Sequence, residues 1–321
     1  MSHSGTEGVL KQKITRELKQ NYQLYILVLL PLVFVGVFSF GPMYGLQIAF
    51  KKYTISKGIL GSPWVGLANF ENLFNNFMFF RAFKNTLLIS IYSILAGFPI
   101  PIMLALALNA TFILKLKKTV QMVTYAPYFI STVVMVGIIL QFTDIRIGII
   151  NQLLGLLGIE SIHFMGNAKL FSSVYVWTGI WQHAGWGSII YVSVLSSIDQ
   201  NLYEAAVVDG ASAFQKIRYI DLPGIMPTAI ILLILNVGLI MNIGFEKILL
   251  LQNSLNLSAS EVIQTYVYKV GIGGGAYYGA AGTVPNYSLA TAVGLFNSVV
   301  GAILVVSLNY VARKFGETSL W

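Results

Sequence analysis

Residues 204–227 read EAAVVDGASAFQKIRYIDLPGIMP, a mostly polar and amphipathic segment that separates two long apolar stretches. At its start, Leu202, Ala205 and Ala206 form a short apolar stripe at helical spacing. The stripe ends at Gly210, a residue suited to the left-handed backbone conformation that closes a helix. The pattern predicts a short amphipathic helix that stops at this glycine.

A second short helix is predicted to begin directly after the glycine. Ser212 is a favourable N-cap, and Gln215 stands three positions later, which is the spacing of a capping box. Phe214 and Ile217 give this helix an apolar side, and Pro223 is predicted to end it, because proline removes a helix hydrogen bond. We therefore expect two short helices joined by an elbow.

The rest of the chain is apolar enough to have the lipid bilayer as its solvent. Of its 321 residues, 56% are hydrophobic and only 10% are charged, and the mean hydropathy is +0.74. A spanning helix needs about 20 mostly apolar residues, and the sequence predicts six. They lie near residues 23–43, 86–110, 119–143, 170–195, 224–250 and 287–311. We expect an all-α, polytopic membrane protein with one transmembrane domain over residues 23–321, preceded by a cytoplasmic basic segment, residues 1–22.

The lysines and arginines predict the side of the membrane on which each connection lies. With the N-terminus inside, eleven basic residues fall on the cytoplasmic side and nine, Lys247 among them, on the outer side. Lys115, Lys117 and Lys118 crowd one very short connection and therefore weigh more in the positive-inside rule. The first apolar run is longer than a signal-peptide core, so we expect it to stay attached. We predict a multi-pass protein of the cell membrane with both termini, and the loop 196–227, in the cytoplasm.

Several classes of function find no support in these residues. There are no cysteines, which excludes iron–sulfur clusters and thiol nucleophiles. The chain has no G-x-x-x-x-G-K-[ST] loop for ATP, and its basic residues are spread over loop ends instead of forming a nucleic-acid surface. No paired carboxylates, histidine cluster or serine-histidine-aspartate set occurs in the predicted spans, so we expect neither a catalytic residue nor a metal site.

The segment 204–227 resembles the cytoplasmic loop of binding-protein-dependent ABC importer permeases, which runs Glu-Ala-Ala, three residues, Gly and later Leu-Pro. Other segments resemble the carbohydrate branch of that family, and the closing ones resemble Gram-positive permeases for complex oligosaccharides. These segments are WVGLANFENLF at 64–74, YAPYFISTVV at 125–134, GIINQLL at 148–154, YSLATAVGLFNSVV at 287–300 and GETSLW at 316–321. The resemblance covers almost the whole chain.

The resemblance implies the fold of a type I ABC importer permease and a set of partners. These are a second homologous permease, an ATPase dimer on the cytoplasmic face that binds ATP and Mg²⁺, an extracellular solute-binding protein and an oligosaccharide substrate. The chain itself would hold no cofactor.

Coupling to the ATPase would pass through residues 201–223. The matching positions are Glu204, Ala205, Ala206, Asp209, Gly210, Ala211, Phe214, Leu222 and Pro223. Glu204 would offer a carboxylate to a basic residue of the ATPase, and Phe214 an apolar contact. Asp209 has two interpretations, a contact with the ATPase or a local partner at the helix end.

Polar and aromatic residues within the predicted spans are candidates for the substrate path, since polar groups in hydrocarbon should face the bundle or a wet cavity. They are Trp177, Trp181, Gln182, His183, Asn236, Asn242 and Asn297. Trp177 and Trp181 share a helix face beside these amides, a combination suited to sugars. Asn236 and Asn242 are six residues apart, about 120° around a helix, so both cannot point at one ligand. Span packing and interhelical hydrogen bonding remain the alternatives.

We therefore predict a permease subunit of an ATP-driven oligosaccharide importer that forms half of the translocation path. Nine basic against five acidic residues on the predicted outer side slightly favour an acidic, uronate-containing substrate. An ion-coupled secondary sugar transporter is the alternative, although Glu246 and His183 are the only clear relay candidates in the spans. A structural or receptor-like membrane subunit is a third interpretation.

Overall fold

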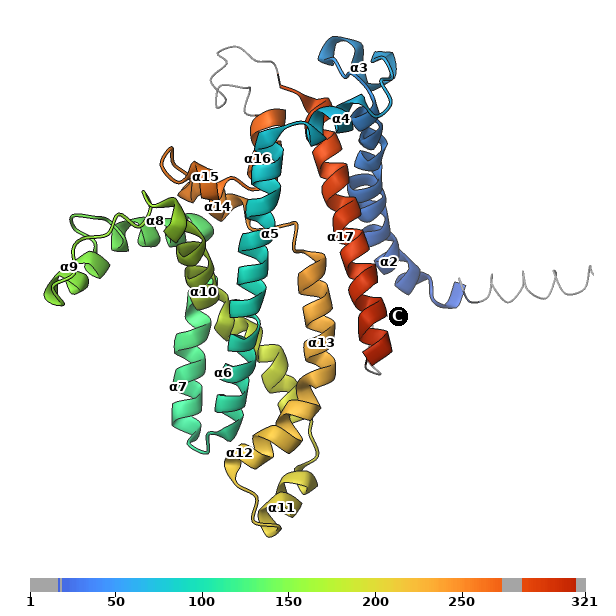
Figure 1. The fold of residues 1–321 in the computed structure, drawn as a ribbon. Coiled ribbons are helices and arrows are strands. Elements are labelled where there is room, and N and C mark those ends of the chain that lie inside the picture. The colour runs from blue at the N-terminus through green and yellow to red at the C-terminus, as the bar shows by residue number, and fades with distance from the viewer. Residues whose placement is uncertain (1–16, 18, 273–284, 316–321) are drawn as a thin grey trace, which may run out of the picture.

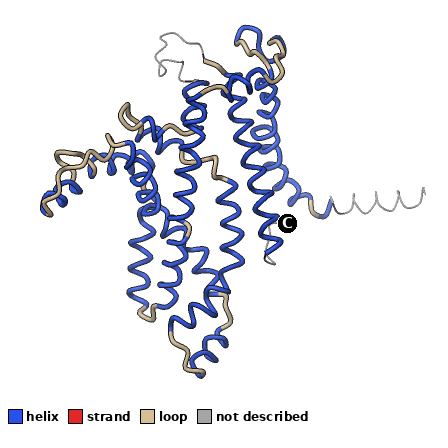
Figure 2. The backbone as a smooth tube through the Cα atoms, in the orientation of Figure 1, coloured by secondary structure: helices blue, strands red, loops and turns tan. Residues whose placement is uncertain are grey.

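A computed structural model describes residue 17, residues 19–272 and residues 285–315 of the chain. Within these residues every regular element is helical, and the single β contact is an isolated antiparallel bridge between Lys51 and Trp64 (Figure 2). The all-α prediction is confirmed. Most of the predicted basic segment 1–22, and the closing residues 316–321, lie outside the described part of the chain.

The helices follow one another with short connections (Figure 1). The first half contains α2 (Tyr22–Val35), η1 (Gly36–Phe40), η2 (Gly41–Phe50), η3 (Ile55–Lys57), α3 (Gly58–Gly61), α4 (Ala68–Phe74), α5 (Phe77–Gly97), α6 (Pro99–Ala110), α7 (Leu114–Tyr125), η4 (Ala126–Phe129), α8 (Thr132–Phe142) and α9 (Ile149–Leu156). The second half contains α10 (Ala168–Ser196), α11 (Gln200–Val208), α12 (Ala213–Lys216), η5 (Ile217–Asp221), α13 (Leu222–Gly238), α14 (Phe245–Leu251), α15 (Leu257–Ser260), α16 (Ile263–Gly271) and α17 (Tyr287–Phe315).

Four helical segments are long and apolar enough to cross a membrane, and a fifth is a bent pair. They are Tyr22–Phe50, Phe77–Ala110, Ala213–Gly238, Tyr287–Lys314 and the pair Leu114–Phe129 with Thr132–Phe142. The predicted span 170–195 coincides with α10, which has 29 residues but is not among these apolar segments. The number of six spans is therefore not confirmed. The helix α10 packs against α5, α6, α7 and α13, and it carries buried polar side chains such as Gln182 and Ser188.

The third predicted span, residues 119–143, is not a straight helix. Its two halves meet at an angle of 102°. Pro127 is the second residue of the short 3-10 turn η4, and Ser131 then caps α8 by accepting a hydrogen bond from the Val134 backbone N–H at 3.4 Å. Hydrophobicity alone does not distinguish such a break from a continuous helix.

The fifth predicted span, residues 224–250, ends twelve residues early. The helix α13 stops at Gly238, the chain turns, and α14 begins at Phe245. In the turn, the Asn242 backbone N–H donates to Leu239 O at 2.7 Å. Asn242, which was assigned to this span, therefore lies beyond the helix that was predicted to carry it.

Three buried clusters hold the helices together. One joins α5, α8, α10 and α14 around Phe171, a second joins α4, α5, α16 and α17 around Phe79, and the third joins α6, α10 and α13 around Tyr191. The helix α2 contributes no buried residue. Its continuation η2 packs against α17, and the apolar side chains of α2 point outward. Such a surface suits lipid or a second membrane subunit.

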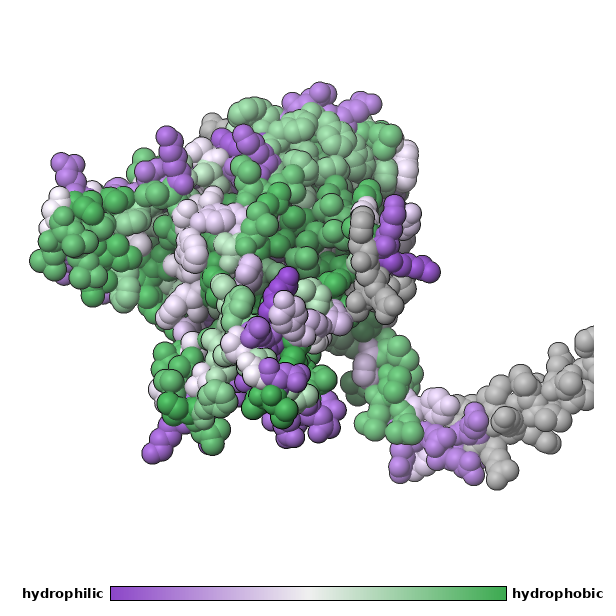
Figure 3. Space-filling model, turned by 60° about the horizontal axis from the view of Figure 1, so that its bottom comes forward, coloured by the Kyte–Doolittle hydropathy of each residue, from purple (hydrophilic) through white to green (hydrophobic). Residues whose placement is uncertain are grey.

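The predicted cytoplasmic segments gather at one end of the bundle. In Figure 1 the turn between α6 and α7, the helices α11 and α12, and the last turns of α17 all lie toward the lower end, whereas α3, α4 and α16 lie toward the upper end. Figure 3 shows hydrophobic residues over much of the visible surface and hydrophilic ones in scattered patches along its edges and on the face turned toward the viewer. This arrangement fits the alternation of sides that the spans require.

Candidate functional site

The elbow between α11 and α12 has the local geometry that its sequence predicts. Gly210 has a φ of +72°, and the Ala211 backbone N–H donates back to Ala206 O at 2.8 Å, which closes α11. At the other side, the Ser212 backbone N–H donates to the Gln215 side chain at 2.7 Å, and the Gln215 N–H donates to the Ser212 hydroxyl at 3.3 Å. The first short helix, the elbow and the capping box are confirmed.

The prediction that Pro223 ends the second helix is wrong. Residues Ala213–Gly238 form one helix through α12, η5 and α13. The reason lies in η5, a turn of π-helix in which the Leu222 backbone N–H donates to Ile217 O. The wider turn accommodates the proline, which has no N–H to donate, at the second position of α13. The elbow is thus joined to a spanning helix without a break.

The surface of this segment carries the predicted docking side chains. Phe214 is 74% exposed, and Glu204 and Asp209 are also exposed. Val208, at the end of α11, adds another large apolar group at the surface. The backbone is thus fixed by its caps while these side chains are available to a partner. No contact within the described residues tests their assigned roles.

A buried carboxylate that the sequence analysis missed connects the elbow to the bundle. Asp221 is 2% exposed and accepts hydrogen bonds from the Tyr203 hydroxyl at 2.5 Å and from Asn109 Nδ2 at 3.2 Å. Tyr203 lies on α11, Asn109 on α6 and Asp221 at the end of η5. Burial, together with the hydrogen bond to Asp221, raises the pKa of Tyr203 to about 12. The sequence contains one indication that Asp221 is buried. It stands four residues after Ile217 and four before Ile225, on the apolar side of the helix.

A cavity of about 580 Å³ lies beside this contact, between α11, α12 and the end of α6. Tyr203, Glu204, Lys216 and Asp221 line it together with apolar residues such as Val207. Glu204 therefore stands at the rim of a groove between the elbow and the bundle, where its carboxylate is accessible to a basic side chain of another protein.

A larger cavity of about 660 Å³ lies within the bundle, among α5, α6, α10, α13 and α14. Three of the predicted path residues line it, namely Gln182, His183 and Asn236. Gln182 is 6% exposed and donates to Ile130 O at 2.9 Å, so it also holds the break before α8. His183 Nδ1 lies 2.9 Å from Gly179 O, and Asn236 Nδ2 donates to Leu232 O at 2.9 Å.

The other four predicted path residues do not line this cavity. Trp177 donates from its indole N–H to the Tyr92 hydroxyl at 2.9 Å, and Trp181 points outward and is half exposed. The Asn242 side-chain oxygen accepts from Asn297 Nδ2 at 3.1 Å and from Gln264 Nε2 at 2.7 Å. The asparagine pair connects the turn after α13 to α17. A role of these four residues in the path stays a prediction.

Lys247 lines the same cavity and was not recognised as a site residue. It is only 8% exposed, on the first turn of α14. Its Nζ donates to Thr178 Oγ1 at 3.0 Å and to Tyr175 O at 3.2 Å, and lies 5.0 Å from the centre of the Tyr175 ring. It was predicted to be one of the outer basic residues, although a lysine within the mostly apolar stretch FEKILLL indicates a special environment.

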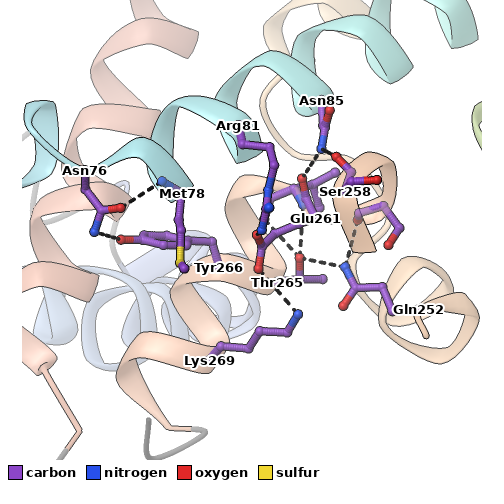
Figure 4. A network of polar contacts seen from close by, with 12 residues as sticks. Asn76, Met78, Arg81, Asn85, Gln252, Ser258, Glu261, Thr265, Tyr266 and Lys269 are labelled. Carbon is purple, nitrogen blue, oxygen red and sulfur yellow. Dashed lines mark hydrogen bonds and ion pairs between the residues drawn. The ribbon is translucent and has the colours of Figure 1, made fainter. Parts of the chain in front are cut away.

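A polar network at the opposite end from the elbow joins α5 to α16 (Figure 4). At its centre Glu261 is fully buried and forms ion pairs with Arg81 and, at 3.5 Å, with Lys269. Asn85 Nδ2 donates to the backbone oxygens of Ser258 and Glu261, each at 2.9 Å. Burial lowers the pKa of Lys269, and the nearby Glu261 carboxylate acts in the opposite sense. These charges fix the outer-end helices to one another.

Comparison with known proteins places this arrangement among transport proteins. The family described as "Binding-protein-dependent transport system inner membrane component" matches residues 77–317. Protein LplB of Bacillus subtilis (strain 168) is 41% identical over 304 residues, which cover 95% of this chain and 92% of LplB. The polygalacturonan/rhamnogalacturonan transport system permease protein YteP of the same organism is 39% identical over 311 residues, which cover 97% of this chain and 94% of YteP.

Solved structures give the same result at the level of the fold. A chain of a bacterial ABC transporter involved in the import of the acidic polysaccharide alginate superposes with a TM-score of 0.85 at 36% identity, over 94% of this chain and 99% of that one. A chain of a bacterial alginate ABC transporter in complex with an alginate pentasaccharide-bound periplasmic protein gives a TM-score of 0.84 at 36% identity, over 95% and 99%.

Proposed function

The chain belongs to the family of binding-protein-dependent transport system inner membrane components, the permease subunits of ABC importers, and on this premise we propose that it forms half of the path by which an ATP-driven importer takes up acidic oligosaccharides. Family membership sets aside the ion-coupled secondary transporter and the receptor-like subunit. The acidic character of the substrate rests on one observation, that relatives named for polygalacturonan, rhamnogalacturonan and alginate transport match nearly the whole chain.

The assembly that we propose has three further components, one of which is a dimer. A second homologous permease completes the path, an ATPase dimer that binds ATP and Mg²⁺ docks at the end that carries α11 and α12, and a solute-binding protein delivers the oligosaccharide at the opposite end. The chain itself holds no cofactor. The exposed apolar surface of α2 and the alternating ends of the bundle support a multi-pass protein of the cytoplasmic membrane with both termini inside.

We propose that the ATPase engages the elbow, residues 201–223. Three features support this role: Phe214 and Glu204 are exposed, Gly210 and the capping box hold the backbone, and the helix continues unbroken into α13. A displacement of the elbow by the ATPase therefore moves a spanning helix directly. Within the path, we propose that the cavity lined by Gln182, His183 and Asn236 holds part of the oligosaccharide during transport.

The test uses the importer assembled with its cognate second permease, ATPase and binding protein in proteoliposomes. The binding protein is loaded with an oligogalacturonate or with a neutral glucose oligosaccharide of the same length, and ATP turnover and uptake are measured together. We expect the acidic ligand to raise both and the neutral ligand to raise neither. Uptake without the ATPase, or stimulation by the neutral ligand alone, would refute the proposal.

A further inference from the structure

Lys247 is a buried cation on the wall of the 660 Å³ cavity, and only 8% of the residue is exposed. It lies in the first turn of α14, which follows the turn at which the predicted fifth span ends. The neighbouring Ile248 and Leu251 belong to a buried cluster, which anchors α14 in the bundle. The ammonium group meets α10, where Tyr175 and Thr178 are within hydrogen-bonding distance.

The charge of Lys247 is not neutralised by an acidic group among the described residues. Its two hydrogen-bond acceptors are neutral oxygens, and no carboxylate lies within ion-pair distance of Nζ in that part of the chain. The Tyr175 ring at 5.0 Å gives a cation–π contact, which is weaker than an ion pair. An ammonium group has three donors, so one remains available on the cavity side.

A buried, unpaired cation is costly, and an anion that enters its surroundings relieves that cost. The situation differs from that of Lys269, another buried lysine, which faces the Glu261 carboxylate at 3.5 Å. The two lysines are buried to a similar degree, 8% and 3% exposed. One has its counter-charge within the fold, and the other faces an open cavity.

The cavity around Lys247 has the size and lining of a ligand site. Small-molecule sites typically measure about 300–1,000 Å³ and combine apolar walls with a few polar groups. Here Phe98 and Phe245 supply aromatic surface, and Asn236 and His183 supply polar groups. Glu246 also lines the cavity, but it is exposed and is not paired with Lys247. A carboxylate on the ligand would favour the side of the ammonium group and avoid that of Glu246.

We propose that Lys247 binds a carboxylate of the transported oligosaccharide and so makes the permease itself selective for acidic sugars. This inference rests on the proposed function and assigns to one residue the recognition of the negative charge. Glu246, on the exposed side of the cavity, accepts hydrogen bonds from sugar hydroxyls. Selection would then occur twice, in the binding protein and again in the membrane.

The first experiment measures binding without delivery. The thermal midpoint of the purified importer, without binding protein, is followed at increasing concentrations of an oligogalacturonate and of its fully methyl-esterified form, which keeps the rings and removes the charge. A ligand that binds the folded state raises the midpoint. We expect the acid form to raise it for the wild type and to act about tenfold to a hundredfold more weakly on Lys247→Gln, the range of one charge-assisted hydrogen bond.

Two further variants show whether the effect belongs to this charge. Lys169→Gln removes the same charge from the exposed start of α10, away from the cavity, and is expected to behave as the wild type. Lys247→Arg keeps a cation and is expected to retain a preference for the acid over the ester. If Lys247→Gln binds the acid form as the wild type does, or if it weakens acid and ester alike, the proposal is wrong.

The second experiment separates this inference from the proposed function. Uptake of oligogalacturonate by proteoliposomes is compared for the wild type, Lys247→Gln and Lys169→Gln with the same loaded binding protein. We expect uptake to fall at least about tenfold for Lys247→Gln alone. Equal uptake by all three would overturn the role of Lys247 and leave the proposed function standing. Absence of acid uptake by the wild type would remove the proposed function itself.

Discussion

The contact of Asp221 with Tyr203 is the clearest place to test how the elbow is held. Tyr203→Phe removes the hydroxyl that donates to the Asp221 carboxylate at 2.5 Å and changes nothing else in volume or ring. The carboxylate, 2% exposed, then retains only Asn109 Nδ2 at 3.2 Å. The substitution therefore loosens α11 from η5 without altering the docking surface.

The size of the destabilisation caused by Tyr203→Phe follows from the charge of the acceptor, the Asp221 carboxylate. A hydrogen bond to a charged group contributes about 1.5–3 kcal/mol, and a buried carboxylate that loses a donor does not regain it from water. Since about 1.4 kcal/mol corresponds to a factor of ten, the opening equilibrium of α11 should rise about tenfold to 150-fold. Asn109→Ala should act in the same direction, and the double variant should deviate from additivity because both donors share one acceptor.

Amide hydrogen exchange of the purified chain in lipid nanodiscs measures this opening directly. We expect faster exchange for the amides of α11 in Tyr203→Phe, with little change in α17. Tyr219→Phe is the matched control, because Tyr219 lies in the same segment and is 73% exposed. In the assembled importer, the looser elbow should lower the uptake per ATP hydrolysed. Unchanged exchange of α11 in Tyr203→Phe, or an equal effect of Tyr219→Phe, would refute the reasoning.

Three other substitutions test separate parts of the chain. Gly210→Ala places a Cβ at a φ of +72° and should destabilise the elbow by about 1–2 kcal/mol, measured as faster amide hydrogen exchange around it. The control is Gly155→Ala, which also places its Cβ in open space but at a helical position and should be neutral or stabilising. Glu261→Gln removes the carboxylate that pairs with Arg81 and Lys269 and should lower the stability of the chain by about 3 kcal/mol. The effect is measured as a fall in the thermal midpoint against the exposed Glu71→Gln, and equal midpoints would contradict the structural role of the network. Glu204→Lys should leave basal ATP turnover intact and abolish its coupling to uptake in proteoliposomes, and normal uptake by this variant would remove the assigned role.

Local sequence determined the features that depend on residues a few positions apart. The elbow at Gly210, the capping box of Ser212 and Gln215 and the all-helical class follow from backbone preferences and short-range hydrogen bonds, and the structure confirms them. The motif at 204–227 was specific enough to indicate the family. These features need no knowledge of what packs against the segment.

Tertiary structure alone decided where long apolar runs break and which charges are buried. The helix continues through Pro223 because η5 widens, and the predicted fifth span ends at Gly238, although hydrophobicity continues to Leu251. Asp221 meets Asn109 across 112 residues of sequence, and Glu261 meets Arg81 across 180. Lys247 was predicted to be an outer charge, and the structure instead places it on the wall of a cavity. The physical reason is the same in each case, because the environment of a polar side chain is set by helices distant in sequence, which no local pattern records.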